Sequence, residues 1–169
     1  KTLLKIVKND KKNFEIVLLT GNKNYKLIIQ QAIYFKVKNI IITDQKFFKL
    51  AKLKLKNKKI NIFNNFENIN EILNKKIDYT MCSIVGLDGL SPIIKIIKYT
   101  NFIAIANKEP IICAWNLINR ELKKNKTDFI PVDSEHFSIW YALKGEKISN
   151  VKKIYLTASG GPLLNFPLN

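Results

Sequence analysis

The sequence is poor in the residues that mark several classes of protein. Its two cysteines, Cys82 and Cys113, lack metal-ligand spacing, so we expect reduced thiols packed in a core and not a disulfide framework. Polar residues interrupt every apolar run well before the roughly 20 residues of a membrane span. The opening KTLLKIVKND has no small-residue cleavage site. These absences predict a soluble intracellular protein without a signal peptide.

Arginine is almost absent, although the chain is strongly basic. The formal net charge is +16, and 28 of the 29 basic residues are lysines, the other being Arg120. Proteins that recognise bases and phosphates usually use the planar fork of arginine, and the lysines here are spread through every segment. The 27 isoleucines and 20 asparagines, together with the lysines, are typical of AT-rich coding sequence. Composition therefore explains the charge, and we expect neither a nucleic-acid nor a membrane partner.

What the 169 residues do contain is an alternation of short apolar runs and longer amphipathic ones. Several of the short runs are apolar throughout, as in parallel sheets covered on both faces. The alternation predicts an α/β fold with a doubly wound, Rossmann-like parallel sheet. The predicted strands are residues 14–20, 39–43, 60–63, 79–85, 102–106, 128–132 and 151–157. The predicted helices between them are residues 24–35, 45–56, 68–76, 91–99, 111–124 and 136–143.

Both ends of the sequence fit this pattern poorly. Residues 2–8 look like a helix, yet the strand and Gly-rich turn that open such a fold are missing before it. At the other end, NFPLN stops shortly after a second Gly-rich turn. We therefore expect a segment of a longer protein, cut at both ends.

Polar residues follow several of the predicted strands, where parallel sheets bind their ligands. After the first strand, Lys23 stands between Asn22 and Asn24, without the acidic residue that binds the ribose of NAD. A cation and amides would suit the 2′-phosphate of NADP, although a polar turn with a helix cap explains the same residues. After two later strands, the segments IVGLDGLSP and ANKEP could approach a cofactor and a substrate, or could simply turn the chain and cap a helix.

The segment PVDSEH carries the most chemistry. Asp133 and Glu135 flank Ser134 as the chain leaves a predicted strand, and hard divalent ions take oxygen ligands of this kind. The same acids would also suit a plain helix N-terminus. We give His136, the single histidine, no catalytic role. Further along, Ser159 precedes two glycines and could present its hydroxyl to a phosphate, or belong to a simple turn.

Taken in order, these segments resemble one family, the 1-deoxy-D-xylulose 5-phosphate reductoisomerases. The resemblance rests on ANKE at 106–109, PVDSEH at 131–136 and LTASGGP at 156–162, with GNKN and IVGLDGL in support. It covers essentially the whole chain, as the amino-terminal part of a longer family member. Two positions depart from the family pattern, with Pro110 where serine is usual and Trp115 where a small residue is common.

The resemblance implies an NADPH- and metal-dependent rearrangement and reduction of 1-deoxy-D-xylulose 5-phosphate to 2-C-methyl-D-erythritol 4-phosphate. It implies NADPH contacts by Asn22, Lys23, Asn24, Asn107 and Glu109. It implies Mg²⁺ or Mn²⁺ ligation by Asp133 and Glu135, substrate contacts by Lys108, Ser134, Glu135 and Ser159, and catalytic roles for Lys108 and Glu135. The third metal carboxylate would lie beyond Asn169, so we expect the segment alone to be inactive.

The domain prediction follows the same resemblance. Residues 1–130 would form an NADPH-binding domain, and residues 131–169 would begin an α+β catalytic domain. The full-length protein would be a homodimer acting on a small sugar phosphate in a bacterial cytoplasm, or in a plastid stroma if the source is eukaryotic. The alternative is another NADP-dependent Rossmann-fold reductase, such as a semialdehyde or homoserine dehydrogenase, which would leave PVDSEH unexplained.

Overall fold

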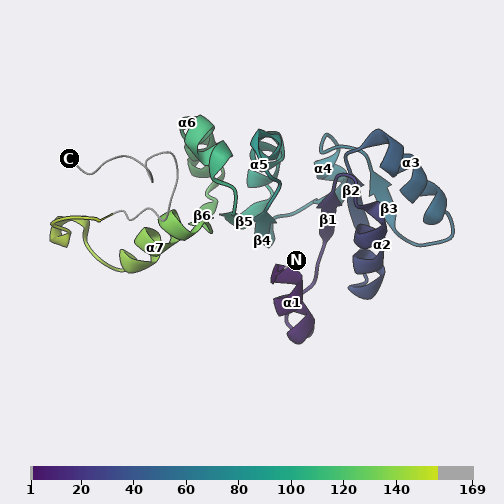
Figure 1. Cartoon of the computed structure of the whole chain (residues 1–169), viewed down its shortest axis with the longest axis horizontal. Helices are drawn as coiled ribbons and strands as arrows, with labels where there is room; N and C mark the ends of the chain where they lie inside the picture. Colours follow the sequence, from purple (N-terminus) through teal and green to yellow (C-terminus); the bar gives the residue numbers. More distant parts are fainter. Residues whose placement is uncertain (1, 156–169) are drawn as a thin grey trace, which may run out of the picture. The chain divides into compact units, whose positions relative to one another are not determined.

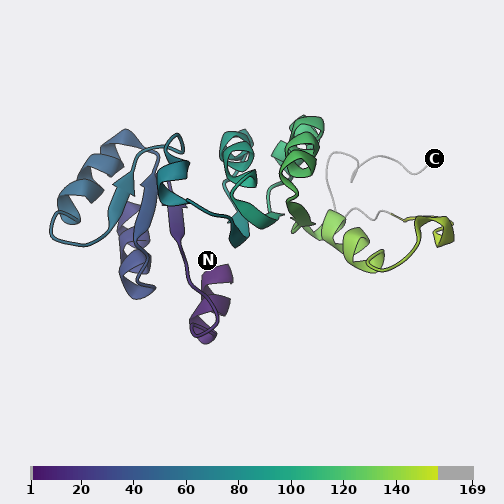
Figure 2. The same cartoon turned by 180° about the vertical axis from the view of Figure 1, so that it is seen from behind.

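The computed structural model describes residues 2–155 and divides the chain into two compact units, Lys1–Asn74 and Lys75–Asn169. Each unit contains a three-stranded sheet in which every neighbouring pair of strands is parallel. Helices alternate with the strands along both units (Figures 1 and 2). The predicted α/β class with parallel sheets is therefore confirmed.

The first unit begins with a helix, as the sequence predicts. The chain runs through α1 (Thr2–Asn9), β1 (Leu18–Gly21), α2 (Tyr25–Tyr34), β2 (Asn39–Ile42), α3 (Gln45–Lys54), β3 (Asn61–Phe63) and α4 (Ile69–Ile72), with strand order β1-β2-β3. Ile40 and Ile42 of β2 pack in one core cluster with residues of α2 and α3, and Ile41 between them is also fully buried. The central strand is thus apolar on both faces, which is why its sequence does not alternate.

The second unit repeats the alternation, and its helix α6 is the longest of the described chain. It contains β4 (Ile77–Cys82), the 3₁₀ turn η1 (Leu87–Gly89), α5 (Leu90–Ile97), β5 (Thr100–Ile105), α6 (Lys108–Asn125), β6 (Asp128–Pro131), α7 (Ser134–Ala142) and η2 (Ile148–Asn150). The strand order is β4-β5-β6, so β5 lies in the centre, and its Ile103, Ala104 and Ile105 are fully buried. Helices α5 and α6 pack against each other.

Three predicted elements differ most from the structure, and the strand predicted over 79–85 runs instead over Ile77–Cys82. Residues 14–17 are not in a strand, because β1 finds its partner only from Leu18, which pairs with Asn39. The helix predicted over 68–76 shrinks to the single turn of α4, where Asn68 makes no side-chain cap. Residues 151–155 of the strand predicted over 151–157 have no regular structure, and the rest of that strand lies outside the described residues.

The two cysteines differ in their surroundings, and the prediction that both pack in the core is wrong for one of them. Cys113 is exposed on the solvent side of α6, whereas Cys82 is partly buried at the end of β4. Burial raises the pKa of Cys82 to about 12, so this residue stays a neutral thiol at physiological pH. Neither a disulfide nor a thiolate nucleophile is indicated at this strand end. Within residues 2–155, no helix is both long and apolar enough to cross a membrane.

Candidate functional site

The three strands of the second unit end at the same level. Cys82 pairs with Ile105, and Ile105 pairs with Pro131, so the carboxyl ends of β4, β5 and β6 form one edge of the sheet. The hydrogen bond from Val132 N to Ile105 O, at 3.1 Å, extends the pairing one residue beyond β6. This register brings the segments that follow the three strands close together, as expected for the ligand-binding edge of a parallel sheet.

Asn107 connects two of these segments. Its Nδ2 donates to the carbonyl oxygens of Ile84, at 2.6 Å, and of Gly86, at 2.7 Å. Its Oδ1 accepts from the backbone N–H of Glu109, at 3.4 Å, so the same side chain caps α6. The side chain is buried, with 8% of the residue exposed. Lys108 and Glu109, the next two residues, are exposed at the start of α6.

Asp133 caps α7 and is held on one oxygen only. Its Oδ1 accepts from the backbone N–H of His136, at 3.1 Å, and lies 2.6 Å from the ring Nδ1 of the same residue. Its side chain is only 9% exposed, and its second oxygen, Oδ2, is buried with no hydrogen-bond partner. A buried carboxylate oxygen without a partner is costly, so this atom is an obvious place for a ligand.

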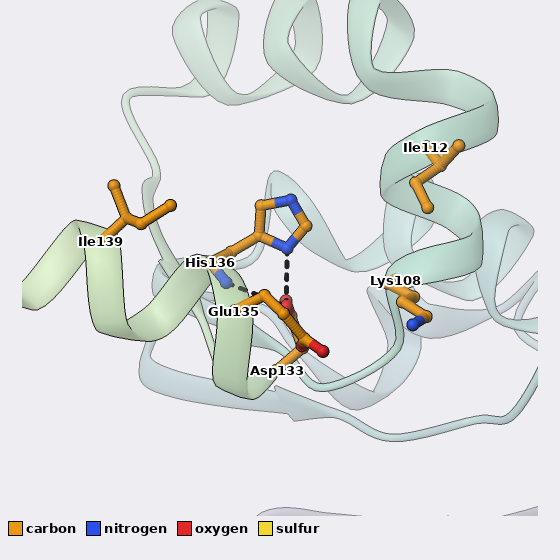
Figure 3. Close-up of a pocket in the computed structure, with 6 residues that line it drawn as sticks. All are labelled: Lys108, Ile112, Asp133, Glu135, His136 and Ile139. Carbon is orange, nitrogen blue, oxygen red and sulfur yellow. Dashed lines mark hydrogen bonds and ion pairs between the residues drawn. The ribbon is translucent and has the colours of Figure 1, made fainter. Parts of the chain in front are cut away.

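A cavity of about 240 Å³ lies beside this carboxylate, lined by Lys108 and Ile112 of α6 and by Asp133, Glu135, His136 and Ile139 at α7 (Figure 3). The two isoleucines come from opposite helices, and the polar residues occupy the space between them (Figure 3). Small-molecule sites usually measure about 300–1,000 Å³, so this cavity is large enough for part of a site.

Both carboxyls of the cavity have lowered pKa values. Burial by itself would raise the pKa of Asp133, but the hydrogen bonds from the backbone and ring of His136 outweigh burial and lower it. The pKa of Glu135 is lowered by a hydrogen bond from its own backbone N–H, then by the Ser134 hydroxyl, which donates to Oε2 at 2.9 Å, with a smaller contribution from Lys108. Two ionised carboxylates therefore face the cavity at neutral pH.

Lys108 is unusual for its position. A cation in the first turn of a helix is opposed by the helix dipole, so it does not stabilise α6 there. Its charge instead attracts the carboxylate of Glu135. Lysine and two carboxylates around one cavity could hold a hard cation and an anionic oxygen side by side. Among residues 2–155, however, no group of three His, Cys, Asp or Glu side chains could hold a metal ion.

The polar turn at residues 22–24 of the first unit differs from the cavity of the second unit. Asn22, Lys23 and Asn24 are all exposed after β1. Asn22 Nδ2 donates to Thr43 Oγ1 at 2.8 Å, which connects this turn to the end of β2, and Asn24 Oδ1 caps α2 through Leu27 N at 3.3 Å. The side chain of Lys23 is free to meet a ligand from solvent.

Comparison with known proteins identifies the family of this chain. The family model described as 1-deoxy-D-xylulose 5-phosphate reductoisomerase matches residues 1–115, and the model of the C-terminal domain of the same enzyme matches residues 129–169. The chain belongs to the 1-deoxy-D-xylulose 5-phosphate reductoisomerase family. The sequence-based resemblance to this family is thereby confirmed.

Comparisons with individual family members support the same assignment. The reductoisomerase of Pelagibacter ubique (strain HTCC1062) is 59% identical over 99% of this chain and 44% of its own length, and that of Wolbachia pipientis subsp. Culex pipiens (strain wPip) is 36% identical over 94% and 40%. The solved reductoisomerase of Zymomonas mobilis, in complex with NADPH, is 27% identical with a TM-score of 0.85, over 97% of this chain and 43% of that one. The chain thus spans less than half the length of these relatives.

The structure brings together some of the predicted site residues. Lys108, Asp133 and Glu135 line one cavity, and Ser134 is bonded to Glu135, while Asn107 and Glu109 lie at the neighbouring start of α6. The turn of Asn22, Lys23 and Asn24 belongs to the first unit and is described separately. Ser159 lies outside the described residues.

Sequence reasoning missed the contribution of His136. No catalytic role was expected for this residue, and the structure shows that its ring contacts Asp133 and lines the cavity. The spacing of three between an acidic N-cap and a histidine was the available signal.

The two departures from the family pattern are accommodated within α6. Pro110 is buried in the first turn, where a missing N–H costs no helical hydrogen bond. Trp115 packs its ring against Phe129 of β6, with centroids 5.5 Å apart. The preceding residue, Ala114, leaves helical geometry at φ −138° and ψ 27°, so the helix is kinked beside the large side chain.

Proposed function

We propose that this chain contributes NADPH-binding residues and two of the metal ligands of a 1-deoxy-D-xylulose 5-phosphate reductoisomerase. This enzyme forms 2-C-methyl-D-erythritol 4-phosphate. The observation that carries the proposal is the buried, unpartnered Oδ2 of Asp133, beside Glu135 and Lys108 in one cavity. Because the chain covers 44% of its Pelagibacter relative, the activity is proposed for the complete gene product. The 169 residues alone are expected to be inactive.

The carboxylates fit a hard divalent ion. Asp133 offers Oδ2 while its other oxygen is held by His136, and Glu135 is exposed and ionised next to it. Mg²⁺ and Mn²⁺ prefer oxygen ligands and tolerate waters in the remaining positions. Solved relatives include a DOX-P reductoisomerase with fosmidomycin and magnesium, 25% identical over 98% of this chain with a TM-score of 0.82. Asp133 and Glu135 would therefore hold Mg²⁺ or Mn²⁺, with a third ligand from outside residues 2–155.

The remaining groups of the cavity would act on the substrate. When bound, the divalent ion supplies Lewis-acid chemistry and NADPH supplies the hydride of the reduction. Lys108 is the catalytic cation, placed to stabilise negative charge on a substrate oxygen. Glu135 faces the same space and has a catalytic role besides metal binding. Ser134 and Ser159 would bind the hydroxylated sugar phosphate, with Ser134 also keeping Glu135 ionised through its hydrogen bond.

The proposed NADPH contacts are considered separately in each unit. Lys23, flanked by Asn22 and Asn24, would bind the 2′-phosphate at the adenosine end, since an exposed cation and amides suit an anion better than a ribose hydroxyl. Glu109, exposed at the start of α6, would contact the cofactor directly. The relative from Zymomonas mobilis is described in complex with NADPH, which supports this assignment.

The wider setting follows from the same family. We assign residues 1–130 to the NADPH-binding domain and residues 131–169 to the beginning of the catalytic domain. The complete protein would act as a homodimer in the bacterial cytoplasm, in line with its bacterial relatives.

The direct test is turnover by the complete gene product. NADPH oxidation should require both 1-deoxy-D-xylulose 5-phosphate and Mg²⁺ or Mn²⁺, and should disappear with a chelator. Lys108→Gln and Glu135→Gln should lose most of the turnover, whereas Lys144→Gln, a lysine beyond α7, should retain it. Metal-independent oxidation of NADPH with an amino-acid semialdehyde, and none with the sugar phosphate, would contradict the proposal and favour the alternative reductase.

A further inference from the structure

Helix α6 consists of two helical segments that meet at Ala114. This residue has φ −138° and ψ 27°, outside the helical region. The segment before it carries Lys108 and Ile112, which line the cavity, and the segment after it carries the buried Ile118 and Leu122. The helix is therefore bent at Ala114, and the segment that carries Lys108 takes its own direction.

The second segment of α6 is anchored at its far end. Lys76 Nζ donates to the carbonyl oxygen of Asn125 at 2.5 Å. The backbone N–H of Thr127 donates to Leu122 O at 3.0 Å, so the chain that leaves the helix is also held. Together with the burial of Leu122, these contacts fix the second segment on the sheet.

The first segment, residues 108–113, has much less to hold it. Of the buried residues of α6, only Pro110 lies in this segment, whereas Ile112 is 68% exposed and Cys113 is exposed as well. Six residues are too few to form a stable helix by themselves. The direction of this segment therefore depends on the contacts made at its joint with the second one.

Trp115 makes such a contact directly after the joint. Residues 108, 112 and 115 would share one face of a straight helix, because they are four and three residues apart. Lys108 and Ile112 do line the cavity, but the ring of Trp115 packs against Phe129, with centroids 5.5 Å apart and the ring planes at 56°. Straightening the helix at Ala114 would withdraw the indole from Phe129 and turn it toward the cavity face.

Phe129 is a fixed partner for this contact. It lies in β6 and pairs with Ile103 of the central strand β5, whose side chain is fully buried. The same strand ends at Pro131 and leads directly to Asp133. The contact of Trp115 with Phe129 therefore connects α6 to the strand that carries the carboxylates of the cavity.

We propose that Trp115 is a positioning residue, which through Phe129 holds the bend of α6 that directs Lys108 toward the carboxylates on the other side of the cavity (Figure 3). The inference rests on the proposed function for the part that Lys108 takes in the reaction. When the contact is lost, the first segment samples other directions. Turnover then falls with the fraction of molecules in which Lys108 faces Asp133 and Glu135.

Three variants of the complete gene product test this contact. Trp115→Ala removes the indole, Trp115→Phe keeps an aromatic ring next to Phe129, and Phe129→Leu keeps an apolar side chain in β6 without a ring. Tyr34→Ala is the matched control, because it removes an aromatic contact with Phe35, at 4.8 Å, in the first unit. Trp115 and Tyr34 are 39% and 47% exposed, so neither truncation empties a buried site.

Amide exchange without ligands shows whether the first segment is held. Trp115→Ala and Phe129→Leu should speed exchange in residues 109–114 and leave residues 116–125 unchanged, since the second segment keeps its own anchors. Trp115→Phe should exchange like the wild type. Faster exchange over both segments would mean a general loss of stability and would overturn the inference.

Turnover at saturating substrate and NADPH shows whether the held direction matters. Trp115→Ala and Phe129→Leu should each lower kcat about two- to tenfold, the range that one aromatic pair supports. The double variant should lose no more than the worse single variant, because both changes remove the same contact. Trp115→Phe and Tyr34→Ala should stay within about twofold of wild type, and Mn²⁺ affinity should be unchanged in every variant.

Three results would contradict the inference. Faster exchange in residues 109–114 with unchanged kcat would mean that the direction of the first segment does not affect Lys108. Lower kcat with unchanged exchange, or losses that add in the double variant, would mean that Trp115 does not act through Phe129. A wild-type protein that does not turn over 1-deoxy-D-xylulose 5-phosphate would instead refute the proposed function, before any variant is compared.

Discussion

The two units present their polar residues at strand ends in opposite ways. In the first unit, Asn22, Lys23 and Asn24 are exposed, and their contacts are with nearby backbone or with Thr43. In the second unit, Asn107 and the Asp133 side chain are more than nine-tenths buried, and their hydrogen bonds fix a turn and a helix start. The turn of the first unit therefore presents an exposed lysine to solvent, whereas the second unit presents buried polar side chains whose positions are fixed by hydrogen bonds.

The difference separates two kinds of recognition. An exposed lysine attracts a phosphate with modest energy, because water and salt screen it. A buried carboxylate with one unpartnered oxygen has already lost its hydration, so a cation that contacts this oxygen meets no further desolvation cost there and is bound strongly. Variants in the second unit should therefore cause the larger losses, and those in the first unit should mainly shift selectivity.

The largest effect is expected for Asp133→Asn. Replacing the charged oxygen by an amide removes a proposed ligand, so the affinity for Mn²⁺ should fall by on the order of 100-fold or more. Free Mn²⁺ measured by electron paramagnetic resonance gives the affinity without any turnover. Asp128→Asn, an exposed carboxylate at the opposite end of β6, is the control and should bind normally. Equal affinities for both variants would remove Asp133 from the metal site.

A smaller loss is expected at His136. His136→Leu removes the ring from Asp133 but keeps the backbone N–H bond to Oδ1, so Mn²⁺ affinity should fall about tenfold, a typical cost for a group that orients a ligand. His136→Asn can place an amide N–H near the position of Nδ1 and should recover most of the affinity. If leucine and asparagine behave alike, the ring does not position the carboxylate.

Lys23→Gln tests the exposed region. We expect NADPH to bind about fivefold more weakly and NADH to bind unchanged, since only NADPH carries the 2′-phosphate. The effect should shrink as salt rises. Lys26→Gln, an exposed lysine in the first turn of α2, should leave both cofactors unaffected. A parallel loss of NADPH and NADH affinity in Lys23→Gln would show that Lys23 does not distinguish the phosphate.

Thr127→Val is expected to lower the stability of the fold without affecting ligand binding. The buried hydroxyl lies 2.8 Å from Ile97 O and 2.9 Å from Thr100 O, near the amino end of the sheet. Removing it should lower the free energy of unfolding by about 1–2 kcal/mol in urea titrations. Binding of Mn²⁺ and NADPH should not change. A change in either would mean that the two ends of the sheet are coupled.

The fold was predictable from the sequence where apolar runs are short and clearly bounded. Residues 39–42 and 102–105 are in strands as predicted, because each range contains a run of three buried apolar residues, which is typical of a central parallel strand. Residues 14–17 show the limit of this signal. Their sequence favours a strand, but β2 begins at Asn39 and offers them no partner. Pairing depends on the neighbouring strand, which a local pattern does not contain.

The candidate site was predictable in its residue types but not in its contacts. The motif PVDSEH contains both acids that line the cavity, whereas the contact of His136 with Asp133 depends on the rotamers of both side chains. Likewise, the motif ANKE marked Asn107 as a binding residue. Only the fold shows that both amide protons are taken by carbonyls more than 20 residues earlier in the chain.

The central claim, that Asp133 and Glu135 hold a divalent ion, is tested most directly by anomalous X-ray scattering from crystals of the complete gene product grown with Mn²⁺. The account predicts a single manganese peak in the cavity, at about 2.0–2.3 Å from Asp133 Oδ2 and from a carboxylate oxygen of Glu135. A manganese peak at other residues, with Asp133 Oδ2 still without a partner, would contradict it.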